Sequence, residues 1–384
     1  MNCLYLFNPD NDMALASFSP YYMAPASAKK MAADLSALPA WVAEGEGAAV
    51  LLTDKSMCQW LNTLQGFFPS VMGTTLVEGP FQRVVPWGWN PSLCKRLSDA
   101  GFPGELPSDE ALKEIRRLSS RALSVDVLSK LNVAGTLGES FLFDSAEAVL
   151  HFLSLHAKAL LKAPWSGSGK GIRLVWTAPD ASLQGWIKHV LNTQGRVVGE
   201  PFYDKVLDFA MEYKVSASRV EWVGYSLFDT DLRGAYKGNR LLSNEGIEQV
   251  LTAYVDKKVL DEVSHSLQRE LENRLSGRYE GYLGVDMMIC RSGEAYAVHP
   301  CVEINLRMNM GVVARLFYDR YVAPRAEGNY VVTFYAKEGE ALAQHQEFTR
   351  RHPLQIDNGR IRSGYLSLTP VLADTRYQVY ILLD

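Results

Sequence analysis

The segment formed by residues 284–311 constrains the fold most, because polar and apolar side chains alternate along it on both sides of a short polar turn. Alternation at every second residue is the pattern of a β-strand, whose successive side chains point to opposite faces of a sheet. We therefore expect two antiparallel strands, residues 284–290 and 295–305, joined by a tight turn in the sequence RSGE. If Ser292 and Gly293 form this turn, Asp286 lies opposite His299.

The polar residues of this hairpin gather at one end. Strand parity places Glu303, Asn305 and Arg307 on one face, and Asp286 approaches Glu303 provided that Pro300 inserts no bulge. Two carboxylates and an amide oxygen suit magnesium, which binds one or two carboxylates together with substrate phosphates. The alternative is an ordinary amphipathic hairpin with a polar outer face. The asymmetric distribution of polar and apolar residues favours the metal site.

A glycine-rich loop lies between two apolar strand-like segments, residues 159–162 and 172–176. The first segment ends at Lys162, and the loop contains Ser166, Gly167, Ser168, Gly169, Lys170 and Gly171. Glycines let backbone N–H groups approach anionic oxygens closely, and the two lysines supply positive charge, so the loop is suited to phosphates. It is neither a P-loop, because Pro164 stands where the first glycine should be, nor a dinucleotide motif, because a strand follows it. A solvent-exposed hairpin turn is the alternative.

Length, charge and cysteine content limit the class of protein. A chain of 384 residues is long enough for two or three domains. Its net charge of -4 is small and charges of both signs are interspersed, so we expect no nucleic-acid partner. The five cysteines are spread without a CxxC pair, which argues against disulfides or a zinc knuckle and favours a cytoplasmic protein. No apolar run reaches membrane-spanning length, so we expect a soluble protein without a membrane partner.

The order of predicted elements indicates an α/β (α+β) protein of three parts. Strand-like runs at residues 4–7, 48–52 and 83–85 alternate with helical stretches, which predicts a small α/β domain over residues 1–117. Residues 118–200 form the part with the glycine loop, and residues 201–384 form the part with the acidic hairpin. The stretch 111–131 predicts one or two helices, and residues 146–156, 183–191 and 257–275 predict one helix each. Beyond residue 323 we expect strands with one helix.

The order of a strand lysine, a glycine loop, a glutamate on a short linker, an aspartate and a Glu-x-Asn motif resembles the ATP-grasp superfamily. The resemblance covers residues 119–315. It implies two antiparallel-sheet lobes that hold ATP between them, preceded by a smaller α/β domain. Residues 1–117 would supply that domain on the side of the substrate.

The resemblance also implies a role for each matching residue. The nucleotide phosphates would be bound by Lys162, by Arg121 in place of an upstream lysine, and by a lid containing Ser166, Gly167, Ser168, Gly169, Lys170 and Gly171. Adenine and ribose would be bound by Glu200, by the backbone of Pro201, Phe202 and Tyr203, and by Glu212, for which Asp204 or Asp208 could substitute. The magnesium ligands would be Asp286, Glu303 and Asn305. The catalytic residues would be Arg307, Lys162 and Lys170.

The implied reaction is the activation of a carboxylate by ATP. Transfer of the γ-phosphate gives an acyl-phosphate, which an amine or thiol attacks while ADP and phosphate are released. The expected cofactors are ATP and two magnesium ions, and the expected partners are a small carboxylate and an amine. The alternatives are a phosphotransferase that stops at a phosphorylated product and a non-catalytic ATP-binding module. A homodimer is compatible with the sequence.

The substrate contacts are less constrained by the sequence. Residues 8–12 (NPDND) follow the first strand, where ligands of α/β sheets bind, but asparagine, proline and aspartate are turn formers and a structural turn is favoured. The sequence RGAYKGN offers Arg233, Tyr236, Lys237 and Asn239 for an anionic substrate. These four residues can equally form a solvated hairpin tip.

Overall fold

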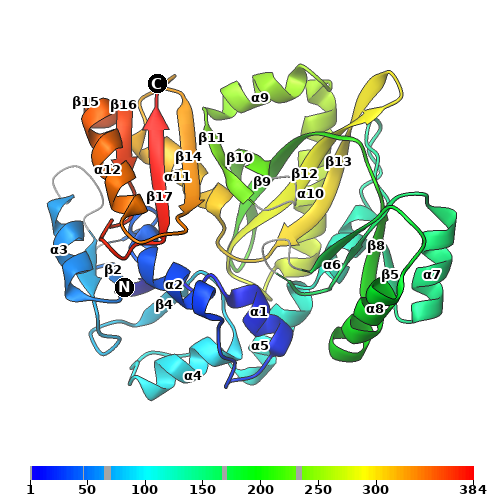
Figure 1. Cartoon of the computed structure of the whole chain (residues 1–384), viewed down its shortest axis with the longest axis horizontal. Helices are drawn as coiled ribbons and strands as arrows, with labels where there is room; N and C mark the ends of the chain where they lie inside the picture. Colours follow the sequence, from blue (N-terminus) through cyan, green and yellow to red (C-terminus); the bar gives the residue numbers. More distant parts are fainter. Residues whose placement is uncertain (1, 46, 65–70, 167–170, 231–235) are drawn as a thin grey trace.

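The computed structural model describes residues 2–45, 47–64, 71–166, 171–230 and 236–384. Three β-sheets organise these residues (Figure 1). One sheet is parallel and lies in the N-terminal part, one is a small antiparallel sheet, and one is large and antiparallel. This is the mixed α/β architecture that the sequence predicts.

The N-terminal sheet has four short parallel strands. They are β1 Cys3–Leu6, β2 Ala49–Leu51, β3 Met72–Thr74 and β4 Arg83–Pro86, paired in the order β3-β2-β1-β4. Its helices are α1 Asn11–Ser17, α2 Ala26–Asp34, η1 Leu38–Trp41, α3 Lys55–Thr63 and α4 Pro91–Asp99. The chain runs from β1 outward to β2 and β3 and then returns to place β4 on the other side of β1. The three strands predicted in this region are confirmed, and β3 is an addition.

Two helices, α5 Asp109–Leu118 and α6 Arg121–Leu128, lead out of this part of the chain. Ser108 Oγ accepts a hydrogen bond from the backbone N–H of Ala111 (3.2 Å), and Ser120 Oγ accepts one from Ala122 (3.3 Å). Each serine therefore caps the N-terminus of one helix. The stretch predicted as one or two helices is divided at this second cap.

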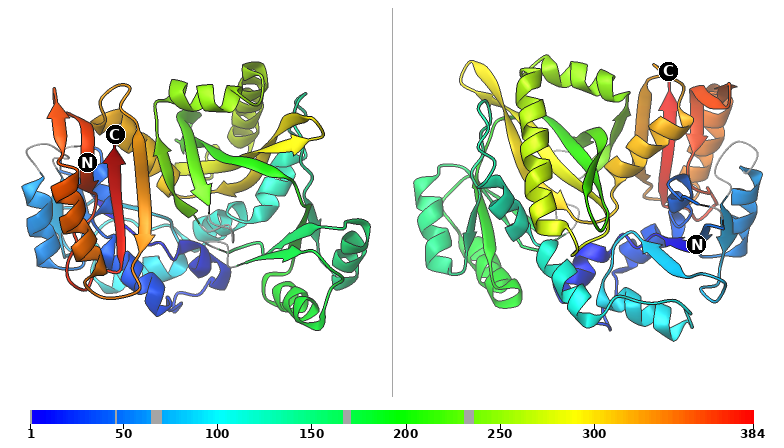
Figure 2. Two further views of the ribbon diagram at one scale, coloured as in Figure 1. Left: turned by 45° about the horizontal axis from the view of Figure 1, so that its top comes forward. Right: turned by 180° about the vertical axis from the view of Figure 1, so that it is seen from behind.

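The small antiparallel sheet has the order β5-β8-β6-β7. Its strands are β5 Phe141–Phe143, β6 Ala159–Lys162, β7 Ile172–Val175 and β8 Val197–Pro201. The helices α7 Ala146–Leu155 and α8 Ala181–Gln194 bury Phe152 and Ile187 against Leu161 on one face of the sheet. Figure 2 shows that this sheet and its two helices project from the rest of the molecule. The two helices leave the other face of the sheet uncovered by these elements.

The large sheet has the order β13-β12-β9-β10-β11-β14-β17-β16-β15. Its strands are β9 Lys205–Val215, β10 Val220–Thr230, β11 Tyr236–Leu241, β12 Gly281–Ser292, β13 Ala295–Asn305, β14 Gly328–Phe334, β15 Gln355–Asp357, β16 Arg360–Ser367 and β17 Tyr377–Leu383. Its helices are α9 Asn244–Thr252, α10 Lys257–Leu275, α11 Met310–Tyr321 and α12 Glu340–Arg351. The C-terminal strands join this sheet where Gly238 of β11 pairs with Val331 of β14.

The acidic hairpin has a different register from the predicted one. Ser292 pairs with Ala295, so the turn consists of Gly293 and Glu294, and Gly293 has a positive φ of 63° that a glycine adopts readily. A bulge then places three residues of β13 opposite one residue of β12. The bulge includes Pro300, which has no N–H to donate to the ladder.

The predicted pairing of Asp286 with His299 is therefore wrong. His299 lies opposite Met288, and Asp286 lies directly opposite Glu303. The turn lies one residue further along the chain than expected, which shifts the pairing of the two strands by two residues. The bulge shifts the pairing by two more. The bulge that was expected to separate the two carboxylates is what brings them together.

Helix α10 anchors the large sheet through a buried stripe. Its residues Leu260, Val263, Leu267, Leu271 and Leu275 are buried in one cluster with Phe209 and other side chains of the sheet. Their spacing of three or four residues is that of one helix face. None of the helices in the described ranges is both long and apolar enough to cross a membrane.

We expect the substitution Leu267→Ala to lower the free energy of unfolding by about 2 to 5 kcal/mol. Leu267 is fully buried, so the substitution removes apolar contacts and leaves a cavity beneath the sheet. Urea unfolding followed by circular dichroism measures the change. Glu262→Ala, at an exposed position of the same helix, is the matched control, and an equal loss in both variants would contradict the assignment of α10 as the anchor.

Candidate active site

A buried ion pair connects two strands of the small sheet. Lys162, at the end of β6, lies 2.6 Å from Glu200 of β8, measured from Nζ to Oε2. The exposed fractions of the two residues are 2% and 5%. Lys162 Nζ also donates to the carbonyl oxygen of Val302 on β13 (3.4 Å), and Ser140 Oγ donates to Glu200 Oε1 (3.1 Å). Lys162 thus links the small sheet to the strand that carries Glu303.

The face of the small sheet that carries Lys162 is apolar around the ion pair. Leu160 of β6 pairs with Leu174 of β7 and with Glu200 of β8, so their side chains share the face opposite α7 and α8. Leu174 is 46% exposed, which is unusual for a leucine within a sheet. An apolar surface beside one carboxylate and one ammonium fits a planar heteroaromatic ring with an anionic tail.

Two carboxylates face each other where β12 meets β13. Asp286 lies opposite Glu303, and Asn305 Nδ2 donates to Asp286 Oδ2 (2.9 Å). Burial raises the pKa of Asp286 to about 7, and the charge of Glu303 adds to this effect. Like charges in opposite positions of two strands destabilise a sheet unless a cation lies between them. The pair is therefore suited to a cation.

Arg121 connects this carboxylate pair to the start of the glycine loop. Its Nη2 lies 2.8 Å from Glu303 Oε1, and its Nη1 donates to the carbonyl oxygen of Ala163 and to Ser166 Oγ, each at 2.6 Å. The residue is 5% exposed. Helix α6 thus supplies one cation that joins β13 to the start of the loop. The sequence places Arg121 among the phosphate contacts but does not reveal its ion pair with Glu303.

Arg307 extends the acidic network into the N-terminal part. Its Nη2 donates to Asn305 Oδ1 (3.1 Å) and to Asp12 Oδ2 (2.8 Å), and its Nε donates to Asp12 Oδ1 (2.9 Å). The pair is bidentate, and its side chains are 19% and 22% exposed. The sequence favours a structural turn at residues 8–12. No spacing rule pairs residues that lie 295 positions apart in the chain.

The three carboxylates considered for ribose lie in different surroundings. Glu212 is 1% exposed and accepts from Asn309 Nδ2 (3.0 Å), and burial raises its pKa to about 8. Asp208, on β9 opposite Met288, is 15% exposed and accepts from Thr230 Oγ1 (3.0 Å). Asp204 lies 3.5 Å from Arg291 at the surface. Asp208 is therefore both near Asp286 and partly open to solvent, whereas Glu212 is enclosed.

Two of the residues considered for an anionic substrate lie inside the large sheet instead. Tyr236 Oη donates to Asn239 Oδ1, and Asn239 Nδ2 donates to Ser226 Oγ (2.5 Å). Asn239 is 3% exposed. These residues form an internal hydrogen-bond network. Ser226 connects this network to Glu212. Lys237 is exposed, and Arg233 lies outside the described residues.

Most of the predicted lid also lies outside the described residues, namely Gly167, Ser168, Gly169 and Lys170. Its ends are described. Lys162 pairs with Ile172, and the backbone N–H of Ala163 donates to the carbonyl oxygen of Gly171 (2.8 Å). The loop therefore connects the antiparallel strands β6 and β7 at the end of β6 that carries Lys162.

The predicted linker residues Pro201, Phe202 and Tyr203 follow Glu200 at the end of β8, an inner strand of the small sheet. The backbone N–H of Phe202 donates to the carbonyl oxygen of Lys158 (3.1 Å), and Tyr203 Oη accepts from the backbone N–H of Glu139 (2.7 Å). The ring of Tyr203 packs edge-on against His299, with 5.3 Å between ring centroids. His299 is fully buried, and burial lowers its pKa to about 3, so it is a neutral packed side chain.

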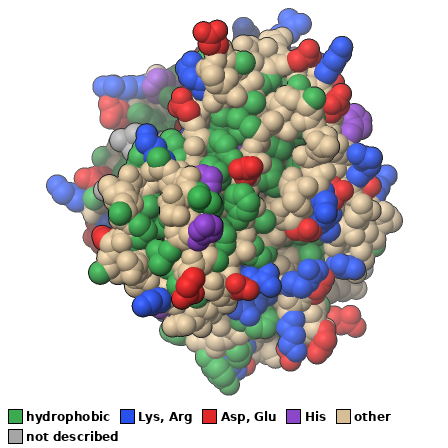
Figure 3. Space-filling model, turned by 90° about the vertical axis from the view of Figure 1, so that its right-hand side faces the viewer, with side chains coloured by type: hydrophobic (Ala, Val, Ile, Leu, Met, Phe, Trp, Pro, Cys, Tyr) green, Lys and Arg blue, Asp and Glu red, His purple; other side chains and the backbone are tan. Residues whose placement is uncertain are grey.

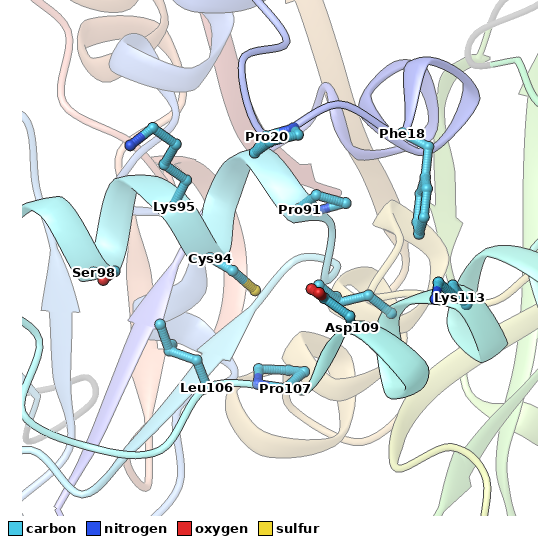
Figure 4. Close-up of a pocket in the computed structure, with 11 residues that line it drawn as sticks. Phe18, Pro20, Pro91, Cys94, Lys95, Ser98, Leu106, Pro107, Asp109 and Lys113 are labelled. Atoms are coloured by element: carbon cyan, nitrogen blue, oxygen red, sulfur yellow. The ribbon is translucent and has the colours of Figure 1, made fainter.

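A cavity of about 500 Å³ lies apart from these residues, between the end of α1, α4 and α5 (Figure 4). It is lined by Phe18, Pro20, Pro91, Cys94, Lys95, Ser98, Leu106, Pro107, Asp109, Leu112 and Lys113. None of the predicted site residues lines it.

The space-filling view in Figure 3 shows acidic and basic side chains interspersed around a band of hydrophobic side chains on one face. That face offers no uniformly basic surface.

The acidic hairpin offers carboxylate and amide oxygens, from Asp286, Glu303 and Asn305. No group of three or more histidine, cysteine, aspartate or glutamate residues with metal-binding geometry occurs in the described ranges. Magnesium is held by one or two carboxylates together with phosphate oxygens, so a site for it need not contain such a group.

Comparisons of the sequence find no matching family model and no matching curated protein. Comparison of the structure finds biotin carboxylase from Campylobacter jejuni in complex with an ATP analogue (TM-score 0.53, 12% identity, 100% of this chain and 87% of that chain). It also finds the ADP complex of N5-carboxyaminoimidazole ribonucleotide synthetase (TM-score 0.52, 11% identity, 100% and 92%). The same synthetase from Thermus thermophilus matches with TM-score 0.50 and 12% identity over 100% and 94%. At such low identity the likeness concerns the fold alone, and it agrees with the ATP-grasp fold that the sequence leads us to expect.

Proposed function

We propose that this protein is an ATP- and magnesium-dependent ligase that activates a carboxylate as an acyl-phosphate for attack by a second substrate. One observation carries the proposal. The Lys162–Glu200 pair, the opposed carboxylates of Asp286 and Glu303, and the guanidinium of Arg307 lie along one continuous set of contacts. These contacts join the two antiparallel sheets at the point where the glycine loop begins.

The small sheet binds the nucleotide in this proposal. Adenine lies on the apolar face beside Leu160 and Leu174, with Glu200 and the backbone of residues 201–203 at its polar edge. Lys162 neutralises the phosphates, and the loop of residues 166–171 covers them. Asp208 replaces Glu212 as the acid that binds ribose, because Glu212 is enclosed by Asn309 and by Gly311, where an added Cβ would lie 2.1 Å from Glu212 Oε1.

The hairpin binds magnesium in this proposal. Asp286, Glu303 and Asn305 would hold two ions together with the phosphate oxygens. Magnesium held there would neutralise charge on the phosphoryl group. Glu303 would then have a second cation as its partner, and Arg121, which also contacts Ser166 at the start of the loop, would be available to the phosphates.

Arg307 holds the carboxylate substrate and then the acyl-phosphate. A carboxylate oxygen attacks the γ-phosphorus and ADP leaves; the second substrate then attacks the carbonyl carbon and phosphate leaves. The protein supplies position and charge rather than a nucleophile, as in other phosphoryl-transfer sites. Closure of the loop excludes water, which would hydrolyse the acyl-phosphate. In the same proposal, residues 1–117, 118–200 and 201–384 act as the substrate-side domain and the two parts that enclose ATP.

A hydroxylamine assay tests the proposed reaction. Purified protein is incubated with ATP, magnesium, hydroxylamine and a panel of carboxylic acids, and we expect one class of acid to give hydroxamate in proportion to ADP. Omitting magnesium or the acid is the control. A stable phosphorylated product without hydroxamate would identify a phosphotransferase. ATP binding without ADP release for any acid would identify a non-catalytic nucleotide-binding protein.

A further inference from the structure

The cavity between the end of α1, α4 and α5 contains none of the residues assigned above to ATP, magnesium or the carboxylate substrate (Figure 4). Its volume of about 500 Å³ lies within the range of small-molecule sites, which is about 300 to 1000 Å³. Phe18, Leu106, Leu112 and three prolines form the apolar part of its wall. An apolar wall of this size favours an organic ligand over a bare ion.

Phe18 forms one side of this wall in a strained backbone conformation. It follows α1 with a φ of 50°, in the left-handed region, where a bulky side chain is uncommon and where a glycine more often ends a helix. Its ring centroid lies 4.8 Å from Arg116 Cζ, and Arg116 Nε donates to the carbonyl oxygen of Leu15 (2.9 Å). These contacts hold the ring within the protein itself, so the wall does not depend on a ligand for its position.

The charged side chains of the cavity differ in how they are paired. Lys95 Nζ lies 2.9 Å from Asp99 Oδ2, and Figure 4 shows that Lys95 points away from the space between α4 and α5. Lys113 Nζ lies 3.7 Å from Glu110 Oε1. Asp109 forms no ion pair and no side-chain hydrogen bond within the part of the chain that the structure describes. Its carboxylate is therefore the charge of this cavity that lacks a partner there.

Asp109 also faces the interior of the cavity. Figure 4 shows the Asp109 carboxylate and the Cys94 thiol directed toward each other across the space between α5 and α4. Burial raises the pKa of the Cys94 thiol to about 11, and the charge of Asp109 adds to this effect. The thiol is therefore neutral near neutral pH. The cavity thus offers one carboxylate among apolar side chains, a combination that attracts an ammonium group carried by an apolar body.

We propose that this cavity binds a small organic cation, with its ammonium group on Asp109 and its aromatic or aliphatic body beside Phe18 and the prolines. A carboxylate or phosphate ligand would meet the charge of Asp109, and it would have to displace Asp99 or Glu110 to reach a lysine. The proposal adds a second ligand site to the protein and does not depend on the ligase function. The ligand of this site is not a substrate of the proposed reaction, because the residues proposed for that reaction lie elsewhere.

Three matched probes test the charge of the ligand with the full-length protein. Benzylammonium chloride, benzyl alcohol and sodium benzoate share one ring and differ in charge. Isothermal titration at constant ionic strength is expected to give a Kd for benzylammonium about three- to tenfold below that for benzyl alcohol, the gain from one partly solvated charge-assisted hydrogen bond. Benzoate is expected to bind least tightly.

A pair of variants tests the role of Asp109. Asp109→Asn removes the carboxylate from the cavity, and it should raise the Kd of benzylammonium to about that of benzyl alcohol while leaving benzyl alcohol unchanged. Glu105→Gln is the matched control, because Glu105 is an exposed carboxylate beside Leu106 that does not line the cavity. It should behave like the wild-type protein. Thermal unfolding of both variants shows whether they fold.

Alkylation by iodoacetamide locates the bound probe. Cys94 lines the cavity, whereas Cys58 is half-buried on α3 and serves as the internal reference. Benzylammonium should slow the alkylation of Cys94 but not that of Cys58, as measured by peptide mass spectrometry with and without the probe in each variant. The protection should persist when ATP and magnesium are added.

Three results would overturn the proposal. The first is equal alkylation of Cys94 with and without benzylammonium, or protection that ATP abolishes, which would place the probe at the nucleotide site. The second is an equal Kd for benzylammonium in the wild-type protein and in Asp109→Asn. The third is binding of benzoate as tight as that of benzylammonium.

Discussion

Replacing Glu303 by glutamine is expected to lower the rate of ADP release by about 100- to 1000-fold, the cost of removing one preorganised charge contact to the reacting group. Glu303 lies opposite Asp286 and within 2.8 Å of Arg121. Glutamine keeps the shape of the side chain and one acceptor oxygen, but it removes the charge that would hold magnesium. The loss should therefore appear in the rate and in a higher magnesium requirement rather than in stability.

The control for this substitution lies on the same hairpin. Glu294 is exposed in the turn between β12 and β13, so Glu294→Gln makes the same chemical change at the other end of the hairpin from Asp286 and Glu303. Initial rates of ADP release are measured against magnesium concentration for both variants. A rate for Glu303→Gln within tenfold of that for Glu294→Gln, with the same magnesium dependence, would remove Glu303 from the metal site.

The substitution Lys162→Met is expected to have two effects of different origin. It should weaken ATP binding by about 10- to 100-fold, because a charged contact to the phosphates is lost. It should also lower the free energy of unfolding by about 3 to 5 kcal/mol, because Glu200 is left as a buried carboxylate without its cation. Isothermal titration with ATP and urea unfolding measure the two effects separately.

A double variant distinguishes these two effects. Lys162→Met combined with Glu200→Gln removes both charges of the buried pair, so most of the stability should return while ATP binding stays weak. Lys188→Met is the matched control, because Lys188 is exposed on α8, which covers the other face of the same sheet. Recovery of ATP binding in the double variant would show that Lys162 has only a structural role.

Local patterns in the sequence predicted much of the secondary structure. The alternation of residues 284–305 predicted the hairpin, and the stretches 111–131 and 146–156 were predicted to be helical, where the structure has helices capped by Ser108 and Ser145. Helix α11 was not predicted, although Asn309 is a capping residue whose Oδ1 accepts from the N–H of Val312 (2.9 Å). A search for capping residues after the hairpin would have found it.

The register of the hairpin is a feature that such local patterns did not predict. If the pairing of two strands shifts by two residues, every side chain stays on the same face of the sheet. The sequence therefore assigned Glu303 and Asn305 to one face without determining which residues lie opposite them. The bulge around Pro300 decided that Asp286 faces Glu303. A bulge depends on how both strands pack on their neighbours, and the alternation of a single strand does not contain that information.

The sequence by itself determined the residue types of the candidate site and the strands that carry them. Periods of two and 3.6 residues, capping residues and glycine loops act over a few neighbouring positions, and a sequence displays them directly. The tertiary structure alone decided that Arg121 meets Glu303, that Arg307 meets Asp12, and that Glu212 is enclosed while Asp208 is partly open. These contacts join residues that lie far apart in the chain, and they exist only because the elements that carry them pack together in the folded protein.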